Sequence, residues 1–257
     1  MFFYDLETTF LSKGSKREDQ QILEVGIIQG RKTFSALVDP VKGYPIISRL
    51  EELGQNPERS IRFWTKLLAG KGVLNNADRR KSIHEQAKKI DSVRADFITP
   101  EDAIKGMVSF GTGVWVAHNG KAFDNKIIQA HLDRHAIKAN IIFKDSLPEI
   151  RKLKLPSHSL GFVYKHLFKQ PFRAHHALDD AKALQRVCKH LKIFEIEPPT
   201  KLTTLKGVGP KTEEVFIQAG ILSVEDLSAW FLKGETWQFK TYKNLHNILL
   251  EQIKTKV

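Results

Sequence analysis

The sequence predicts a mixed α/β sheet with helices on its faces, followed by a small all-α domain. Three runs of β-forming residues lie within residues 2–38, and the links between them are too short for crossovers, so we expect an antiparallel meander. Helical and strand patterns then alternate, as in a sheet covered by helices. Residues 197–200, Glu-Pro-Pro-Thr, form a stiff polar break. We therefore divide the chain into domains 1–197 and 198–257.

Each expected element has its own local signal. β-branched and aromatic residues bounded by glycine or charge predict strands at residues 2–6, 23–28, 33–38, 114–117 and 141–143. From about 41 to 110 the pattern is helical, with Asn56 as a suitable cap and with Pro57 and Pro100 at first helical positions. Apolar periodicity predicts further helices at residues 123–135, 159–168, 177–191, 210–219 and 235–257.

Charge and composition narrow the class of protein. The 257 residues include 41 Lys and Arg against 29 Asp and Glu, and the net charge of +12 suits a polyanionic partner, although many proteins are basic without one. No apolar stretch approaches the roughly 18–20 residues of a membrane span. The single cysteine, Cys188, excludes an internal disulfide and a zinc site built from cysteines. Without a signal-peptide pattern, we expect an intracellular protein, cytoplasmic or nuclear, with no membrane partner.

Two carboxylates lie near the end of the first expected strand. Asp5 and Glu7 are two residues apart, so strand geometry points both side chains to the same face. Carboxylates that share one face of an apolar strand repel each other unless a cation lies between them. The alternative is an exposed edge strand with harmless charges. This pair alone leaves both interpretations open.

Further polar residues follow later elements. His118 comes directly after a buried strand, and Asp124 enters the first turn of the next helix. His175 and Asp180 lie at the start of another helix. Taken singly, an Asp in a first helical turn is explained by the helix dipole, and the histidines by an exposed loop.

Together these residues resemble the DEDDh (DnaQ-like) 3′→5′ exonucleases. That family is marked by D-x-E, a later single Asp, and H-x-x-x-x-D, which match Asp5 with Glu7, Asp124, and His175 with Asp180. The motifs occur in the family's order and span nearly the whole first domain. The resemblance implies an RNase H-like mixed sheet flanked by helices.

The resemblance also implies the chemistry of the site. Two Mg²⁺ or Mn²⁺ ions would take hard oxygen ligands from four carboxylates: Asp5, Glu7, Asp124 and Asp180. His175 would take the proton of the attacking water, and nucleoside 5′-monophosphates would leave from a 3′ end. The terminal nucleotide would be held by residues around the first two motifs: Leu6, Thr8, His118, Asn119 and Phe123. Phe123 fits a core position equally well, and we expect His176 to contact solvent or a substrate phosphate.

The second domain resembles the helix-hairpin-helix family over about residues 200–228. Its hairpin glycines, Gly207 and Gly209, allow positive φ and close backbone approach just before a helix. The N–H groups at that helix start, with Lys211 and Thr212, would bind DNA backbone phosphates without reading sequence. A helical bundle for protein contact or for stability is the alternative.

Together the two resemblances imply a divalent-metal-dependent 3′→5′ exonuclease that acts mainly on DNA, a preference that rests on the second domain. A 3′ exoribonuclease and a non-catalytic nucleic-acid-binding protein that keeps the fold stay open as alternatives. So do the oligomeric state and the presence of a polymerase or repair partner. The helical insertion at about 41–110 carries basic residues for which a solvated surface is favoured over substrate contact: Arg59, Arg62, Lys66, Lys71, Arg79, Arg80 and Lys81.

Overall fold

The computed structural model describes most of the chain as two compact units. The described residues are 1–194, 202–219, 221, 224, 227, 230 and 243–254. The two units are residues 1–193 and 194–257, and the boundary that we expected after residue 197 lies outside the described residues. Among the described helices, none is both long enough and apolar enough to cross a membrane.

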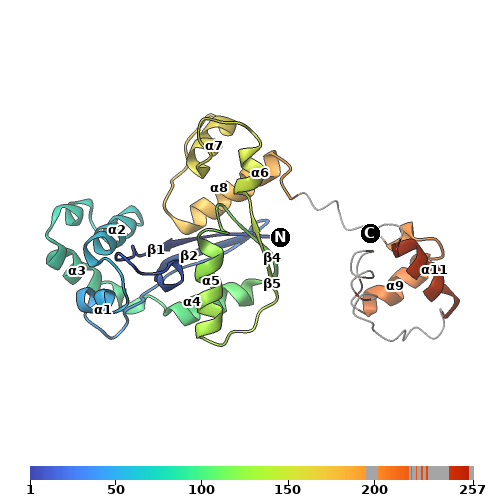
Figure 1. The fold of residues 1–257 in the computed structure, drawn as a ribbon, viewed down its shortest axis with the longest axis horizontal. Coiled ribbons are helices and arrows are strands. Elements are labelled where there is room, and N and C mark those ends of the chain that lie inside the picture. The colour runs from blue at the N-terminus through green and yellow to red at the C-terminus, as the bar shows by residue number, and fades with distance from the viewer. Residues whose placement is uncertain are drawn as a thin grey trace. The chain divides into compact units, whose positions relative to one another are not determined.

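A five-stranded mixed sheet forms the centre of the first unit (Figure 1). Its strands are β1 (Phe2–Thr8), β2 (Ile22–Gln29), β3 (Lys32–Leu37), β4 (Gly113–Ala117) and β5 (Ile141–Asp145). They lie in the order β3-β2-β1-β4-β5, in which β1, β2 and β3 are antiparallel neighbours and β4 and β5 run parallel to β1. The predicted fold class, an α/β RNase H-like mixed sheet flanked by helices, is thereby confirmed for this unit.

Helices cover both faces of this sheet and one of its ends. The α-helices are α1 (Ile46–Glu52), α2 (Pro57–Gly70), α3 (Ile83–Asp91), α4 (Pro100–Phe110), α5 (Asp124–Arg134), α6 (Leu147–Arg151), α7 (Leu160–Phe168) and α8 (Ala177–His190). Short 3₁₀ segments are η1 (Arg17–Asp19), η2 (Asn76–Arg80) and η3 (Arg94–Asp96). Figure 1 shows α8 on one face of the sheet, α4 and α5 on the other, and α1, α2 and α3 gathered beyond one end.

Side chains of β1 alternate between the two faces of the sheet, so apolar and acidic residues lie on opposite faces. Tyr4 and Leu6 are buried in the core cluster that includes Ile127 and Ile128 of α5. Because successive side chains in a strand alternate, Asp5 and Glu7 point to the opposite face, where α8 packs. The acidic pair therefore lies beneath the helix that carries the third sequence motif.

The first turn of α8 reaches the sheet because residue 26 of β2 has no side chain. Gly26 pairs with Asp5 across the β1–β2 ladder. A Cβ at Gly26 would overlap the backbone of Ala177 and Leu178. Close approach of two backbones is a recurrent reason for glycine within a strand. The start of α8 consequently lies next to Asp5.

The insertion at about 41–110 is helical, as predicted, and contains α1 to α4. α2 begins after Asn56, whose side chain accepts from the Arg59 N–H at 3.0 Å, and Pro57 occupies the first helical position. Ile61, Trp64 and five other residues of α2 are buried, which fixes this helix in a second core cluster.

The second unit is described in part. It contains the 3₁₀ segment η4 (Leu202–Thr204) and the helices α9 (Pro210–Gln218) and α11 (Lys243–Lys254). Apolar side chains from these segments form one cluster, including Leu205, Phe216 and Leu249. α9 confirms the helix expected at 210–219. Residues 235–242 and 255–257 of the expected last helix lie outside the described residues.

Candidate active site

Three of the predicted carboxylates converge in the structure. Asp5 and Glu7 come from β1, and Asp180 comes from the first turn of α8. One side-chain oxygen from each lies within 4.8 Å of the other two. The cluster forms because Asp5 and Glu7 lie on the same face of β1 and because α8 packs closely against β2 at Gly26.

The fourth carboxylate, Asp124, reaches the same region from α5. β1 pairs with β4 only at Phe2 and Phe3, so the rest of that strand edge is not paired with β4. Asp124 Oδ1 accepts a hydrogen bond from the Leu6 N–H at 3.2 Å on β1. The negative charge of Asp124 also raises the pKa of Asp5, as expected for neighbouring carboxylates. Four carboxylates are thus brought together.

Burial and mutual repulsion disfavour charge on these four groups. Burial is the largest cause in each case: it raises the pKa of Asp5 well above its usual range, and that of Glu7 to about 8. It likewise raises the pKa of Asp124 to about 7 and that of Asp180 to about 6, and neighbouring acidic charges add to each. A divalent cation held by their oxygens would remove this penalty. The donor set fits the predicted Mg²⁺ or Mn²⁺.

The two adjacent histidines before α8 differ in environment. His175 is exposed and has φ of 65°, a left-handed conformation that is uncommon outside glycine. Burial and the Lys66 ammonium lower the pKa of its imidazole. His176 is 6% exposed, and its N–H donates to Asp180 Oδ2 at 3.0 Å. Our expectation that His176 contacts solvent is therefore wrong, because its side chain packs against α2 at Gly70.

Glu24 is a site residue that the sequence analysis missed. It pairs with Glu7 across β1 and β2, and its side chain is fully buried. Lys71, at the end of α2, places its ammonium nitrogen 2.6 Å from Glu24 Oε1 and offsets part of the rise in pKa that burial causes. An acidic residue inside the apolar run of residues 22–28 is the signal that predicts a partnered charge there.

Two predicted substrate-binding residues on β1 are already engaged with protein. The Leu6 N–H is bonded to Asp124, and the Leu6 side chain is buried in the core. Thr8 is 7% exposed, and its Oγ1 accepts from Gln20 Nε2 at 2.8 Å. Leu6 thus holds Asp124 in place, and contact with a nucleotide stays a prediction for both residues.

The other three predicted substrate-binding residues lie between β4 and α5. His118 has both ring nitrogens within hydrogen-bond distance of protein groups: Nδ1 is 3.1 Å from Ser146 Oγ, and Nε2 is 2.8 Å from the His158 carbonyl oxygen. Asn119 has φ of 61° in the turn that precedes α5. Phe123 is half-buried, with the Arg17 guanidinium 3.9 Å from its ring centroid. His118 therefore braces the loop, and a nucleotide contact stays a prediction for all three.

The predicted DNA-binding residues of the second unit separate into two kinds. Gly207 has φ of 92°, and a Cβ there would lie 2.5 Å from Leu245 Cδ1, so the fold itself requires glycine. Thr212 is 7% exposed, which favours a packing role over phosphate contact. Gly209 caps α9 with open space where a Cβ would be, and Lys211 is exposed beside it. Phosphate contact by Gly209 and Lys211 stays a prediction.

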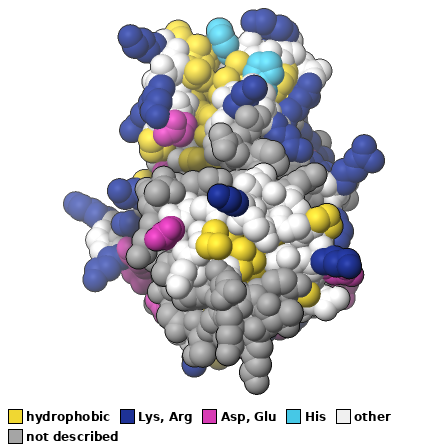
Figure 2. All heavy atoms as spheres, turned by 90° about the vertical axis from the view of Figure 1, so that its right-hand side faces the viewer, with side chains coloured by type: hydrophobic (Ala, Val, Ile, Leu, Met, Phe, Trp, Pro, Cys, Tyr) yellow, Lys and Arg dark blue, Asp and Glu magenta, His cyan; other side chains and the backbone are white. Residues whose placement is uncertain are grey.

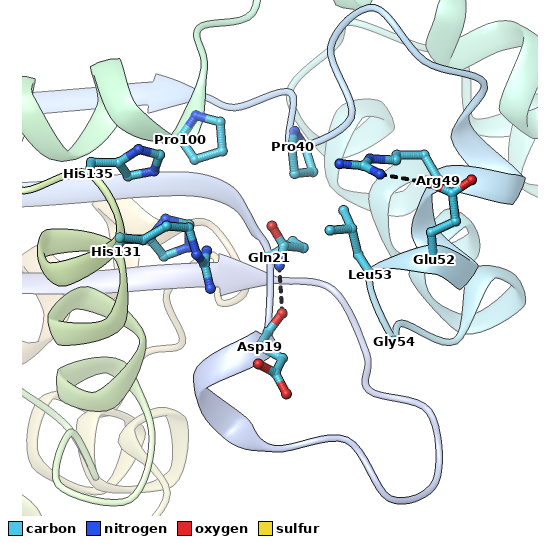
Figure 3. A pocket seen from close by; sticks show the side chains of 11 residues that line it. Asp19, Gln21, Pro40, Arg49, Glu52, Leu53, Gly54, Pro100, His131 and His135 are labelled. Carbon is cyan, nitrogen blue, oxygen red and sulfur yellow. Dashed lines mark hydrogen bonds and ion pairs between the residues drawn. The ribbon is translucent and has the colours of Figure 1, made fainter.

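A separate cavity of about 620 Å³ lies between α1 and α5. Figure 3 shows His131 of α5, and His135 just after this helix ends, across the cavity from Arg49, Glu52 and Leu53. Arg49 and Glu52 form an ion pair of 2.7 Å. None of the predicted site residues lines this cavity.

Comparison with known proteins gives partial similarities. No family model matches the chain. A stretch of 83 residues, 30% of this chain, is 37% identical to an uncharacterized exonuclease of Acanthamoeba polyphaga mimivirus, and the match spans a quarter of that protein. The zinc-bound complex of E. coli ExoI with single-stranded DNA is similar with a TM-score of 0.48 and 14% identity, over 89% of this chain and 44% of that one.

Proposed function

We propose that this protein is a divalent-metal-dependent 3′→5′ exonuclease that acts mainly on DNA and releases nucleoside 5′-monophosphates. The observation that carries the proposal is the convergence of four carboxylates beside an exposed histidine at the end of β1. A binding protein has no use for buried acids that repel one another, whereas phosphodiester hydrolysis needs them to hold metal. The 83-residue similarity to a viral exonuclease supports nuclease chemistry.

Each residue of the site has a distinct part in this reaction. Asp5, Glu7, Asp124 and Asp180 would hold the divalent ions, which lower the pKa of a bound water and stabilise the leaving oxygen. His175 accepts the proton as the water oxygen attacks phosphorus and the P–O3′ bond breaks. Its lowered pKa keeps the imidazole neutral, and able to accept a proton, at neutral pH. The proton reaches solvent from an exposed side chain.

Charge supports a nucleic-acid substrate. Lys and Arg side chains are spread widely over the face drawn in Figure 2, and Asp and Glu are sparser there. With a net charge of +12, the chain attracts polyanions at low ionic strength. The preference for DNA over RNA rests on the resemblance of the second unit to helix-hairpin-helix domains.

The test is a digestion of 5′-labelled single-stranded DNA, duplex DNA and RNA of one sequence. With Mg²⁺, we expect DNA shortened one nucleotide at a time from its 3′ end, nucleoside 5′-monophosphate as product, and slower loss of RNA. With EDTA, we expect no cleavage. Asp5→Asn should lower the rate by several orders of magnitude, because it removes one metal ligand.

The matched control is Asp133→Asn, which changes an exposed carboxylate on α5 away from the cluster. It should cleave like the wild type. Equal digestion with and without metal would exclude the metal-dependent mechanism. Faster digestion of RNA would favour the exoribonuclease, and binding without cleavage would favour the non-catalytic alternative.

A further inference from the structure

A small cavity lies beside His175, and the helical insertion builds most of its wall. Its volume is about 120 Å³. It is lined by Phe63, Lys66, Leu67, Gly70, Asn76, Arg79, Ala174, His175 and His176. Two basic side chains from the insertion thus share a cavity with the proposed general base.

Local geometry explains why these insertion residues face the same space. Phe63, Lys66 and Gly70 recur along α2 at helical spacing and so lie on one face. Asn76 and Arg79 are three residues apart in η2, and a 3₁₀ helix has three residues per turn, so their side chains also align. Two short faces therefore converge on the segment that carries His175.

This cavity lies on the α2 side of the carboxylates. The Phe63 ring of α2 contacts the ring of Phe10, three residues beyond Glu7, at 5.5 Å between centroids. At the end of α2, Lys71 pairs with Glu24, which is the cross-strand neighbour of Glu7. α5 reaches the carboxylates from its own side through the bond from Leu6 to Asp124. A strand whose terminal nucleotide lies near α5 would pass the carboxylates and then meet this cavity.

Lys66 and Arg79 are the cations available there. Both side chains are exposed, and among the residues that the structure describes neither has an ion pair. Other basic residues of the insertion are engaged: Arg62 with Glu58, Lys71 with Glu24, and Lys81 with Asp78. Unpaired cations beside a general base suit a negatively charged substrate group.

We propose that Lys66 and Arg79 bind the backbone phosphate on the 5′ side of the scissile phosphate and so position the strand beneath His175. The proposal rests on the proposed nuclease function and assigns part of its substrate specificity to the insertion. The guanidinium of Arg79 can donate two parallel hydrogen bonds to the phosphate oxygens, and Lys66 supplies a point charge. The sequence pattern alone favoured a solvated surface for both residues; both are exposed, and their shared cavity beside His175 is what favours a substrate contact.

The first test compares Lys66→Met and Arg79→Met with two controls, Arg62→Met on α2 and Arg80→Met beside Arg79, neither of which lines the cavity. Full-length proteins are assayed on single-stranded DNA with Mg²⁺ at several salt concentrations. Lys66→Met and Arg79→Met should each raise KM about tenfold, the value of one charge-assisted contact, with kcat changed less than threefold. Each should flatten the salt dependence of kcat/KM by about one phosphate contact, and the controls should do neither.

The second test removes the charge from the substrate instead. In the oligonucleotide, the linkage on the 5′ side of the scissile one is made a neutral methylphosphonate. Wild-type KM should rise by up to about a hundredfold, because the neutral linkage removes both contacts, and each variant should lose only about tenfold further, because one of its two contacts is already missing. Equal losses in wild type and variants would overturn the proposal, as would variants that match their controls or that change kcat alone. An inactive wild type would instead refute the proposed function itself.

Discussion

At the scale of single residues, the neighbouring histidines before α8 have opposite environments and therefore opposite expected roles. His175 is exposed with a left-handed backbone, and His176 is buried against Gly70. His175→Ala should lower kcat about 10²–10⁴-fold, the usual effect of removing a general base, and should abolish the acidic limb of the pH–rate profile. That limb should lie below pH 6.5, since burial lowers the pKa of this imidazole from that value.

His176→Ala is the comparison for this prediction. It removes a buried ring, so we expect a lower melting temperature with the acidic limb retained. Thermal melts and pH–rate profiles of both variants would separate the two roles. A lost limb in the His176 variant, with a normal one in the His175 variant, would reverse the assignment.

The four carboxylates predict how stability depends on pH in the absence of metal. Their pKa values are raised in the folded state, to about 8 for Glu7, about 7 for Asp124 and about 6 for Asp180. The folded state thus binds more protons than the unfolded one, and this contribution to the unfolding free energy falls as pH rises from about 4 to about 8. In EDTA, Asp124→Asn should gain in melting temperature relative to wild type over that range.

Added Mg²⁺ should reverse the loss, because a cation stabilises the ionised carboxylates. The rise in melting temperature with Mg²⁺ should be larger at pH 8 than at pH 5 in the wild type and smaller in Asp124→Asn. Differential scanning fluorimetry at both pH values measures each effect. An equal Mg²⁺ effect at pH 5 and pH 8 would contradict the coupling between metal and these protons.

At the scale of elements, the contact of α8 with β2 places the last carboxylate. Gly26→Ala would force α8 away from β2, because the new Cβ meets backbone and not a flexible side chain. We expect a loss of about 1–3 kcal/mol in unfolding free energy, typical of overpacking, and a marked loss of metal-dependent cleavage as Asp180 moves away from Asp5. Urea unfolding and single-turnover rates measure the two effects.

Gly161→Ala in α7 is the matched control. No atom lies within 4 Å of a Cβ at that position, so the substitution meets open space. Alanine in a helix is favoured over glycine by about 0.5–1 kcal/mol, so this variant should be as stable as the wild type or more so. If Gly26→Ala behaved in the same way, close packing of α8 would not be what positions Asp180.

Features of the site that follow from the residue spacing within one strand or helix could be predicted from the sequence. Features that depend on how strands and helices pack against one another could not. The two-residue spacing of Asp5 and Glu7 predicts a shared face, and strand and helix patterns predict the sheet and its main helices. α6 was not predicted, because five residues are too few to show a helical period. The burial of His176 and the seat of α8 on Gly26 could not be predicted, because both follow from contacts between segments distant in sequence.

The surroundings of other residues could not be predicted either, because they depend on contacts between segments far apart in the sequence. His118 is held by the carbonyl of His158, 40 residues away, so its ring is committed to protein. Lys66 has a helical spacing typical of an exposed face, and only the position of α2 beside the His175 segment shows what that face meets. A single sequence shows which residues lie on the same face of a helix, but it does not show which segment packs against that face.

At the scale of the whole molecule, charge is divided unequally between the two expected domains. Residues 198–257 carry 8 basic and 6 acidic side chains, a net +2, so most of the net charge of +12 belongs to the first domain. Electrostatic attraction of nucleic acid is therefore expected chiefly from the first domain. The second domain would contribute a few local phosphate contacts to affinity.

Removing the second domain tests this division of labour. We expect a protein of residues 1–197 to bind long single-stranded DNA more weakly, to keep most of its salt dependence, and to cleave short oligonucleotides at an unchanged rate.

Gly209→Val in the full chain should weaken binding in the same way, because its side chain fills the open space before the N–H groups of α9. Lys211→Ala should flatten the plot of log Kd against log salt by about 0.7, one single-strand phosphate contact. Gln218→Ala, at the exposed far end of α9, is the control and should bind as wild type. Unchanged affinity and salt dependence after deletion would instead assign the second domain to protein contact or stability, since a helix that binds no phosphate has no counterions to release.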